Sequence, residues 1–430
     1  MLDSPGAALP KGYLSKSNCL TVALPRIGGG TTGQAIRGTM RIAQVAPLTE
    51  RVPPQFYGGT ERVVSYLTEE LVRLGHEVTL FASGDSVTRA RLQAPCPRAL
   101  RLDPDCGIPL THHLRMLGQV YQRAQEFDVI HCHTDYLGLP LTRFTSTPTV
   151  ITLHGRLDIP DLGPIYSEYP EVPLVSISDA QRIHLPGLNW AATIHHGLPP
   201  DLYSFAPRPG AALLFLGRIS PEKRPDTAIR VACRSGVPLR IAAKVDVVDR
   251  EYFETTIRPL LDHPLVEFIG EVDEPQKRAL LSDTLALLFP VDWPEPFGLA
   301  MIEALACGTP VIARPRGAVA EVLRDGVTGL LCETEDEMVE AVGRVATLDR
   351  ATCRREFEQR FTTRVMTQHY LQVYQESLQA RVLRRHYRGE ESRVAPAFSG
   401  STEGYIPHGN GEDRGGVYSP ASLSLQKSRA

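Results

Sequence analysis

Two glutamates that stand eight residues apart, Glu295 and Glu303, enclose the segment Pro-Phe-Gly-Leu-Ala-Met-Ile. A Pro-Phe-Gly turn here predicts a helix start, so the segment combines hydroxyl-binding carboxylates with the free N–H groups of a first helical turn. Gly308 and Pro310 predict the end of this short helix. On a regular helix with a rise of ~1.5 Å per residue, the acids would lie roughly 12 Å apart. The segment predicts a site for a polyol joined to an anion; the alternative is an amphipathic helix with two solvated acids.

Two cations earlier in the chain predict a place for the anion. Arg218 ends an apolar strand, and Lys223 follows a glycine turn at an expected helix N-terminus. A helix dipole disfavours a cation at that position, so Lys223 indicates a nearby anion, and Arg218 offers a fork of donors for phosphate oxygens. The pattern predicts a diphosphate site. The alternative is a surface pair between Lys223 and Glu222 or Asp226.

The segment His131-Cys132-His133 is the one metal-like pattern in the chain. These residues follow an apolar strand, and no further ligands stand near them in the sequence. We therefore expect no metal at this position.

The composition is that of a two-domain globular protein. A chain of 430 residues exceeds the size of a single core, and a formal net charge of -3 gives no electrostatic case for nucleic acid. The eight cysteines form no CxxC pair, which favours a cytoplasmic location. No apolar run is long enough for a transmembrane helix, and no lysine-rich amphipathic helix indicates membrane association.

Apolar strands alternate with amphipathic helices through most of the chain, a pattern that predicts parallel sheets with helices on both faces. Polar residues follow the strands expected at 129–130, 149–153 and 174–177, and in such sheets the carboxyl ends of strands form the ligand crevice. Other expected strands lie at 42–45, 77–81, 213–216 and 311–313, and expected helices at 63–74 and 114–127.

A proline-bearing connector at 199–209 predicts the boundary between two domains. The first 39 residues lack a signal-peptide core, and Met40 directly precedes the first strand and could be the start codon. The expected division is a flexible extension at 1–39, domains at 40–200 and 201–363, a helix at 364–386, and a disordered tail at 387–430.

A series of short motifs runs in order along residues 40–385. The motifs include Tyr57-Gly-Gly-Thr-Glu61, Asp128-Val-Ile-His131, Leu153-His154-Gly155, Gly217-Arg218 with Lys223, Glu295 to Glu303, and Ala306 to Ile312. Together they resemble those of glycosyltransferase family 4, whose members are retaining sugar-nucleotide transferases. The resemblance implies the GT-B architecture of two facing Rossmann-like α/β domains, with a last helix that packs back on the N-terminal domain. Two positions depart from the family pattern: His195-His196-Gly197 replaces a usual Asn-Gly pair, and Gly317-Ala318 replaces a common double glycine.

The resemblance also implies a role for each matching residue. Arg218 and Lys223 would hold the donor diphosphate, Glu303 would bind the ribose, and Glu295 would bind hydroxyls of the transferred sugar. Ser178 is expected to cap a helix. The remaining implied donor contacts are the side chain of His154 near the reacting carbon, the backbone N–H groups of Phe297, Gly298 and Leu299, and the close backbone approach allowed by Gly58 and Gly59.

The implied reaction moves a hexose from a nucleotide sugar to a hydroxyl acceptor without a metal or other cofactor. Positive groups would neutralise the departing diphosphate. The sequence shows no carboxylate nucleophile on the acceptor side, so the resemblance implies attack from the same face, with Glu295 as nucleophile the alternative.

The segments Lys244 to Asp249 and Asp292 to Gly298 are similar to a bacterial subgroup that includes UDP-glucose:tetrahydrobiopterin glucosyltransferases. This similarity favours UDP-glucose as donor and a small soluble acceptor. The alternatives are a nucleotide-sugar epimerase or hydrolase, and a nicotinamide-dependent oxidoreductase. The sequence argues against the oxidoreductase, because no G-x-G-x-x-G motif follows the first strand.

Overall fold

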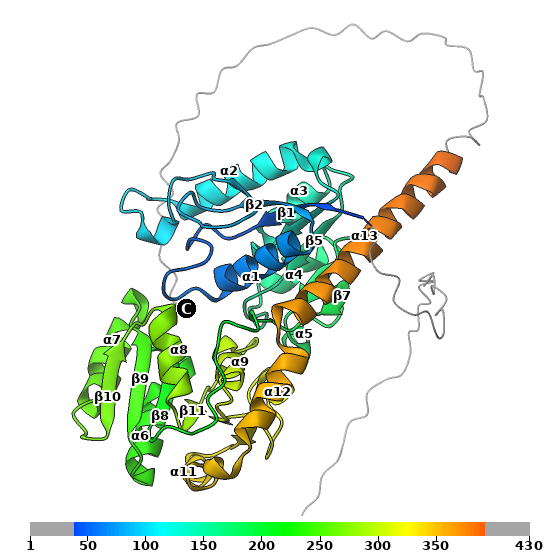
Figure 1. Ribbon diagram of the computed structural model, residues 1–430. Helices are drawn as coiled ribbons and strands as arrows, with labels where there is room; N and C mark the ends of the chain where they lie inside the picture. The colour runs from blue at the N-terminus through cyan, green and yellow to red at the C-terminus, as the bar shows by residue number, and fades with distance from the viewer. Residues whose placement is uncertain (1–37, 392–430) are drawn as a thin grey trace, which may run out of the picture.

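The computed structural model describes residues 38–391, with side chains as far as residue 383. Nearly all of the expected N-terminal extension and C-terminal tail therefore lies outside the described residues. The described chain forms two α/β domains, each built on one parallel sheet, with the first domain above the second in Figure 1.

The first domain holds seven strands and five α-helices. Its strands are β1 (Arg41–Val45), β2 (Glu77–Phe81), β3 (Arg91–Gln93), β4 (Val129–Cys132), β5 (Thr149–Thr152), β6 (Leu174–Ser176) and β7 (Trp190–Thr193). Its helices are α1 (Gly59–Arg73), α2 (Pro109–Gln122), α3 (Leu139–Thr142), α4 (Leu162–Ser167) and α5 (Asp179–Arg182). The strands lie in the order β3-β2-β1-β4-β5-β6-β7.

The second domain holds six strands and seven α-helices. Its strands are β8 (Leu213–Arg218), β9 (Leu239–Lys244), β10 (Val266–Gly270), β11 (Ala286–Phe289), β12 (Val311–Ala313) and β13 (Gly329–Leu331). Its helices are α6 (Pro225–Ser235), α7 (Arg250–Tyr252), α8 (Glu274–Ser282), α9 (Leu299–Ala306), α10 (Val319–Val322), α11 (Glu335–Arg344) and α12 (Arg350–Arg360). The strands lie in the order β10-β9-β8-β11-β12-β13.

The central strands of each sheet are buried on both faces, which explains why they are largely apolar. In β1, Ala43 and Val45 belong to one core cluster, whereas Ile42 belongs to another on the opposite face. In β11, Leu287 and Leu288 likewise face different clusters. Strand alternation thus places helices against both sides of the sheet.

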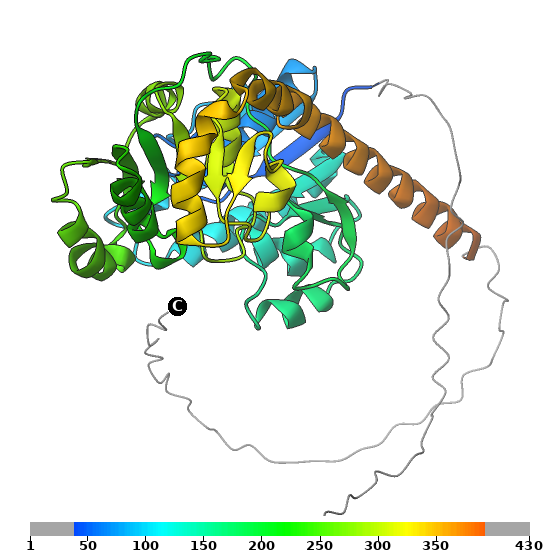
Figure 2. The same ribbon diagram turned by 90° about the horizontal axis from the view of Figure 1, so that it is seen from below.

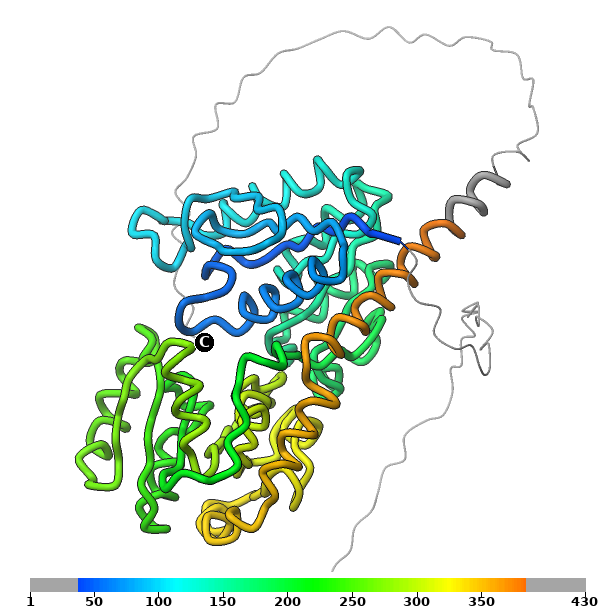
Figure 3. Tube along the Cα trace, in the orientation of Figure 1, coloured from blue at the N-terminus to red at the C-terminus, as the bar shows by residue number. Residues whose placement is uncertain are grey.

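The last helix, α13 (Thr363–Glu391), leaves the second domain and packs on the first. Its Tyr370 and Tyr374 are fully buried, and they share a core cluster with Val63 and Leu67 of α1. Figures 2 and 3 show α13 running past the first domain after α12. The helix extends to Glu391, beyond residue 386, where the sequence analysis ends it.

The chain passes between the two domains twice, and the two connecting segments lie side by side. The N–H of Leu198 donates to the carbonyl of Phe361, and the N–H of Thr363 donates to the carbonyl of Leu198, each at 2.8 Å. A Cβ at Gly197 would lie 2.3 Å from the carbonyl oxygen of Thr362, so only glycine allows this approach. The His195-His196-Gly197 segment departs from the family pattern, but it keeps the glycine, and this close approach explains why.

Most expected elements agree with the structure, and one helix does not. The strands at 77–81 and 311–313 match β2 and β12 residue for residue. The helix expected at 114–127 was wrong in position, because α2 begins with Pro109 in its first turn and residues 124–126 form a separate 3-10 turn. Across residues 38–391, no helix combines the length and apolarity needed to cross a bilayer.

Candidate active site

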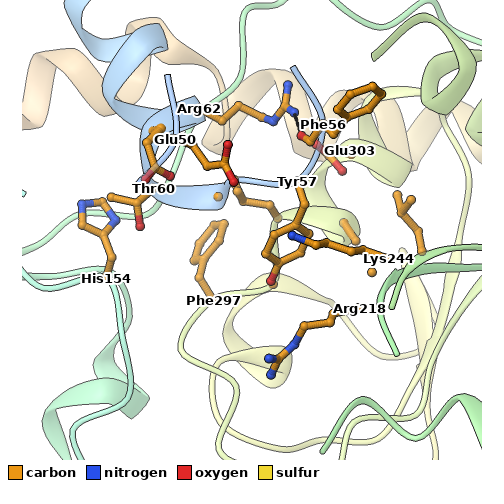
Figure 4. Close-up of a pocket in the computed structure, with 18 of the residues that line it drawn as sticks. Glu50, Phe56, Tyr57, Thr60, Arg62, His154, Arg218, Lys244, Phe297 and Glu303 are labelled. Carbon is orange, nitrogen blue, oxygen red and sulfur yellow. Dashed lines mark hydrogen bonds between the residues drawn. The ribbon is translucent and has the colours of Figure 1, made fainter. Parts of the chain in front are cut away.

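A cavity of about 590 Å³ lies between the two domains, walled by strand ends and helix starts from both (Figure 4). Every residue with an expected donor role lines this cavity. These residues are Gly58, Gly59, His154, Arg218, Lys223, Glu295, Phe297, Gly298, Leu299 and Glu303. The fold thus brings together side chains from distant parts of the sequence.

Glu295 and Glu303 lie on different structural elements of the chain. Helix α9 begins at Leu299, after Gly298 in the left-handed conformation with φ 85°, so Glu303 lies on the helix and Glu295 lies in the turn before it. The helix thus begins at the Pro-Phe-Gly turn as expected, and because Glu295 precedes it, the helical rise does not set the separation of the two acids. The helix ends as expected, with Gly308 at φ 78°.

Gly317 fixes the backbone of Glu295. A Cβ at Gly317 would lie 2.3 Å from the carbonyl oxygen and 2.4 Å from the nitrogen of Glu295. The N–H of Ala318 donates to the same carbonyl at 2.9 Å. The Gly317-Ala318 pair thus holds one cavity acid in place, although it departs from the family's double glycine.

Lys223 contacts Glu295 instead of a surface acid. Its Nζ donates to Oε2 of Glu295, and the indole N–H of Trp293 donates to the same oxygen at 2.8 Å. The alternative of a surface pair with Asp226 was wrong, because Arg224 takes that carboxylate. Lys223 ends a 3-10 turn at residues 221–223, two residues before α6 begins.

Arg218 stands at the carboxyl end of β8, at the cavity wall. Its Nη1 lies 3.2 Å from Oδ2 of Asp249, and its side chain is 30% exposed. The single partner leaves other guanidinium N–H groups available to an anion. In Figure 4, Arg218 lies across the cavity from His154.

Two helix N-termini meet at the cavity. Gly59 begins α1 in the first domain, and a Cβ at this position would lie 3.5 Å from Cδ1 of Leu299, which begins α9 in the second. The first N–H groups of a helix have no intrahelical partner and carry partial positive charge. Both helices therefore favour an anion at the same place.

Close packing requires a glycine at position 58, which the sequence alone does not show. A Cβ here would lie 2.8 Å from Cβ of Pro54, so a larger residue would displace the loop that precedes α1. The expected reason, close approach to phosphates, remains a proposal. Ser178 behaves as expected: its side chain accepts from the N–H of Gln181 and caps α5.

Buried histidines support His154. Its Nε2 lies 2.9 Å from Nδ1 of His133, whose Nε2 lies 2.9 Å from Oε1 of Gln44. The ring of His131 is held between Thr152 and Tyr374, each at 2.7 Å. Both ring nitrogens of His131 and His133 thus have protein partners. Within residues 38–391, no group of three or more His, Cys, Asp or Glu side chains is arranged to hold a metal.

Burial lowers the pKa of these histidines. The pKa of His154 falls to about 3, and those of His131, His133 and His196 fall well below 6.5, because the desolvated site disfavours the imidazolium. His154 is therefore neutral at physiological pH. A neutral imidazole adds no positive charge to this wall of the cavity.

We expect the free energy of unfolding to fall as the pH drops from 7 to 5. Below about pH 6.5 the histidines of the unfolded chain become protonated, whereas the four buried histidines of the folded chain stay neutral. Burial raises the pKa of Glu61 to about 7 and that of Asp135 to about 6, so these carboxyls oppose the trend. Burial also lowers the pKa of His76 and His113, so the histidines outnumber the carboxyls and the net effect of acidification is a loss of stability.

Urea unfolding at pH 7, 6 and 5 measures this dependence, and His133→Gln is the matched variant. The variant should be less stable at pH 7 but should lose less stability on acidification. A free energy of unfolding that stays constant over this range would contradict the prediction.

Some cavity residues have no role in the sequence analysis. Glu50, Glu61 and Asp135 line it from the first domain. The expectation that no acceptor-side carboxylate acts as the nucleophile stays a prediction. Asp135 has φ 49°, an uncommon backbone conformation for a residue with a side chain. Its position after β4 was a usable signal, since polar residues at strand ends were expected there. Lys277 of α8 had no comparable signal.

Comparison with known proteins identifies the class. The family model Glycosyltransferase Family 4 matches residues 57–216, and the model Glycosyl transferases group 1 matches residues 206–361. The fold is similar to that of sucrose-phosphate synthase from Thermosynechococcus elongatus, with a TM-score of 0.65 and 19% identity over 79% of this chain and 100% of that one. It is also similar to AviGT4, a glycosyltransferase involved in avilamycin A biosynthesis, with a TM-score of 0.60 and 24% identity over 79% and 98%.

Two facing parallel-sheet domains and the matched models define a GT-B glycosyltransferase. The two models together cover residues 57–361, most of the chain, and show a glycosyltransferase with a family 4 domain followed by a group 1 domain. Curated relatives include a phosphatidyl-myo-inositol mannosyltransferase from Mycobacterium leprae, 27% identical over 72% of this chain and 87% of its own length. A glycogen synthase from Mycobacterium tuberculosis is 28% identical over 66% and 81%.

Proposed function

We propose that this glycosyltransferase moves glucose from UDP-glucose to a hydroxyl of a small acceptor, with retention of configuration. The observation that carries the proposal is the convergence on one cavity of Arg218 and Lys223, Glu295 and Glu303, and the starts of α1 and α9. Cations and helix N–H groups suit a diphosphate, and carboxylates suit the hydroxyls of ribose and hexose. HepE from Anabaena, which shares the fold at a TM-score of 0.62 and 17% identity, was crystallised with UDP and glucose, which supports a UDP-linked donor.

In the proposed reaction, the bond between the anomeric carbon and the diphosphate oxygen breaks first. Positive charge grows on the sugar, and negative charge grows on the diphosphate, where Arg218 and Lys223 stabilise it. The acceptor hydroxyl then attacks the same face, and its proton passes to an oxygen of the departing diphosphate. Glu295 holds the sugar through its hydroxyls.

The charges of the first domain favour an acceptor without a phosphate. Two arginines of this domain line the cavity, and each is already paired: Arg62 with Glu274, and Arg101 with Glu50. Glu61 and Asp135 add hydrogen-bonding carboxyls to the same wall. We therefore propose an uncharged or amine-bearing hydroxyl compound as acceptor.

Thermal-shift measurements with UDP-, ADP- and GDP-sugars test the donor, and UDP-glucose should raise Tm the most. Incubation with UDP-glucose and a panel of hydroxyl acceptors, followed by mass spectrometry, tests transfer. Steady release of glucose, or formation of an epimer, at a rate that no acceptor increases would favour a hydrolase or an epimerase instead.

Turnover should persist in excess EDTA. Arg218, Lys223 and the starts of α1 and α9 supply the positive charge that a metal ion provides in other transferases. UDP release is measured before and after chelation, and again after addition of Mg²⁺ or Mn²⁺. Loss of turnover in EDTA and its recovery with metal would contradict the proposed diphosphate site.

A further inference from the structure

A chain of alternating charges runs along the cavity wall from the first domain to the second. Arg62 of α1 donates to Oε2 of Glu274, the first residue of α8. Nζ of Lys277 lies 3.0 Å from the same Oε2 and 2.5 Å from Oε1 of Glu303. All four side chains line the cavity.

Glu274 is the junction of this chain. Its Oε2 accepts from both domains, and its Oε1 accepts from the hydroxyl of Tyr203 at 2.7 Å. Tyr203 belongs to the connector between the domains and is 1% exposed. One carboxylate therefore ties the first domain, the connector and the second domain together.

The two ends of the chain lie at functional positions. Oε1 of Glu303 accepts from Nζ of Lys277. Its Oε2 has no hydrogen-bond partner among the side chains and backbone that the structure describes, so it is available to a ligand. At the other end, Nη2 of Arg62 donates to the carbonyl of Phe56 at 2.8 Å, in the loop that leads to Gly58. The chain thus connects the loop before α1 with the acid of α9.

Burial makes each link depend on the next. Arg62 and Lys277 are each 8% exposed, and Glu303 is 4% exposed. Removal of one member of a buried ion pair leaves its partner uncompensated, so the neighbouring carboxylate must rearrange or take up a proton. A change at Arg62 should therefore alter Glu303, although the two residues belong to different domains.

We propose that Arg62, Glu274 and Lys277 are positioning residues that couple nucleotide binding at Glu303 to the contact between the two domains. The inference rests on the proposed function only in taking Glu303 as the acid that binds the ribose. By reciprocity, a bound nucleotide stabilises the contact between Arg62 and Glu274.

Calorimetric titration with two probes tests the proposal. UDP carries ribose and diphosphate, whereas uridine carries ribose alone. Lys277→Met and Arg62→Met should each weaken the binding of both probes by a similar factor, about fivefold or more, which is the lower end of typical couplings between sites. Combining Arg62→Met with Glu303→Gln should add little to the effect of Glu303→Gln alone, because both act through one carboxylate.

Three further variants keep the test decisive. Arg73→Met removes an exposed arginine from the other end of α1 and should leave both affinities unchanged. Arg62→Lys keeps the charge opposite Glu274 and should restore most of the affinity. If Arg62→Met does not fold, as judged by circular dichroism, Glu274→Gln provides the same measurement.

Two results would overturn the proposal. Weaker binding of UDP with unchanged binding of uridine would make Arg62 a direct phosphate ligand. Normal binding of both probes by Arg62→Met, together with weak binding by Glu303→Gln, would show that the acid works without the coupling. If Glu303→Gln itself bound both probes normally, the proposed donor site would fail instead.

Discussion

Replacement of Arg218 or Lys223 by alanine should lower turnover on the order of 10²-fold or more, as expected for the loss of a group that stabilises the transition state. Both side chains line the cavity between the domains, where charge develops on the diphosphate. Lys223 has a second role in the structure, because its ammonium also holds Oε2 of Glu295. We therefore expect Lys223→Ala to have the larger effect of the two.

The measurement is the rate of UDP release from UDP-glucose at saturating donor, with circular dichroism to verify the fold. Arg240→Ala is a matched control, because Arg240 lies on β9, next to the strand of Arg218, and pairs with Asp283 outside the cavity. Its turnover should equal that of the unchanged protein. Near-normal turnover in both Arg218→Ala and Lys223→Ala would contradict the assignment of the diphosphate site.

Substitutions of the two cavity acids should separate catalysis from nucleotide binding. Glu295→Gln keeps the shape of the side chain but weakens its charge-assisted bonds to sugar hydroxyls, so we expect a loss of kcat with UDP affinity little changed. Glu303→Gln should weaken UDP binding, because its expected partner is the ribose. It should also weaken the contact with Lys277, which supports the carboxylate at 2.5 Å.

Calorimetric titration with UDP distinguishes the two variants, since UDP contains ribose and diphosphate but no hexose. Glu340→Gln, an exposed acid on α11, is the control for removal of one negative charge. Weak UDP binding by Glu295→Gln with normal binding by Glu303→Gln would reverse the proposed orientation of the donor.

Strand positions could be predicted because their signals are local. The run from Glu77 to Phe81 is bounded by Gly75 and is apolar on both faces, and it forms β2 as expected. Parallel sheets bury both faces of their strands, so the strands stand out as continuous apolar runs. The start of α2 was harder to predict, because Ile108 and Leu110 are apolar but largely exposed and do not mark a buried face.

The segments that meet at the cavity could also be predicted, but the contacts among their side chains could not. Polar residues after apolar strands, together with the acids around Pro-Phe-Gly, indicated which segments meet at the cavity. The need for glycine at position 317 could not be predicted, because it arises from the close approach of the Glu295 backbone in the folded protein. The contacts of Lys223 and Trp293 with Glu295, which precedes α9, were not visible in the sequence either.

By itself, the sequence determined the alternation of strands and helices, the two-domain division and the residue types at the strand ends, since each depends on neighbours along the chain. Only the tertiary structure decided which lysine meets which acid. Lys223 reaches Glu295 across 72 positions, and Lys277 reaches Glu303 across 26. Such contacts depend on the order of strands in a sheet and on how helices pack against it, and local periodicity encodes neither.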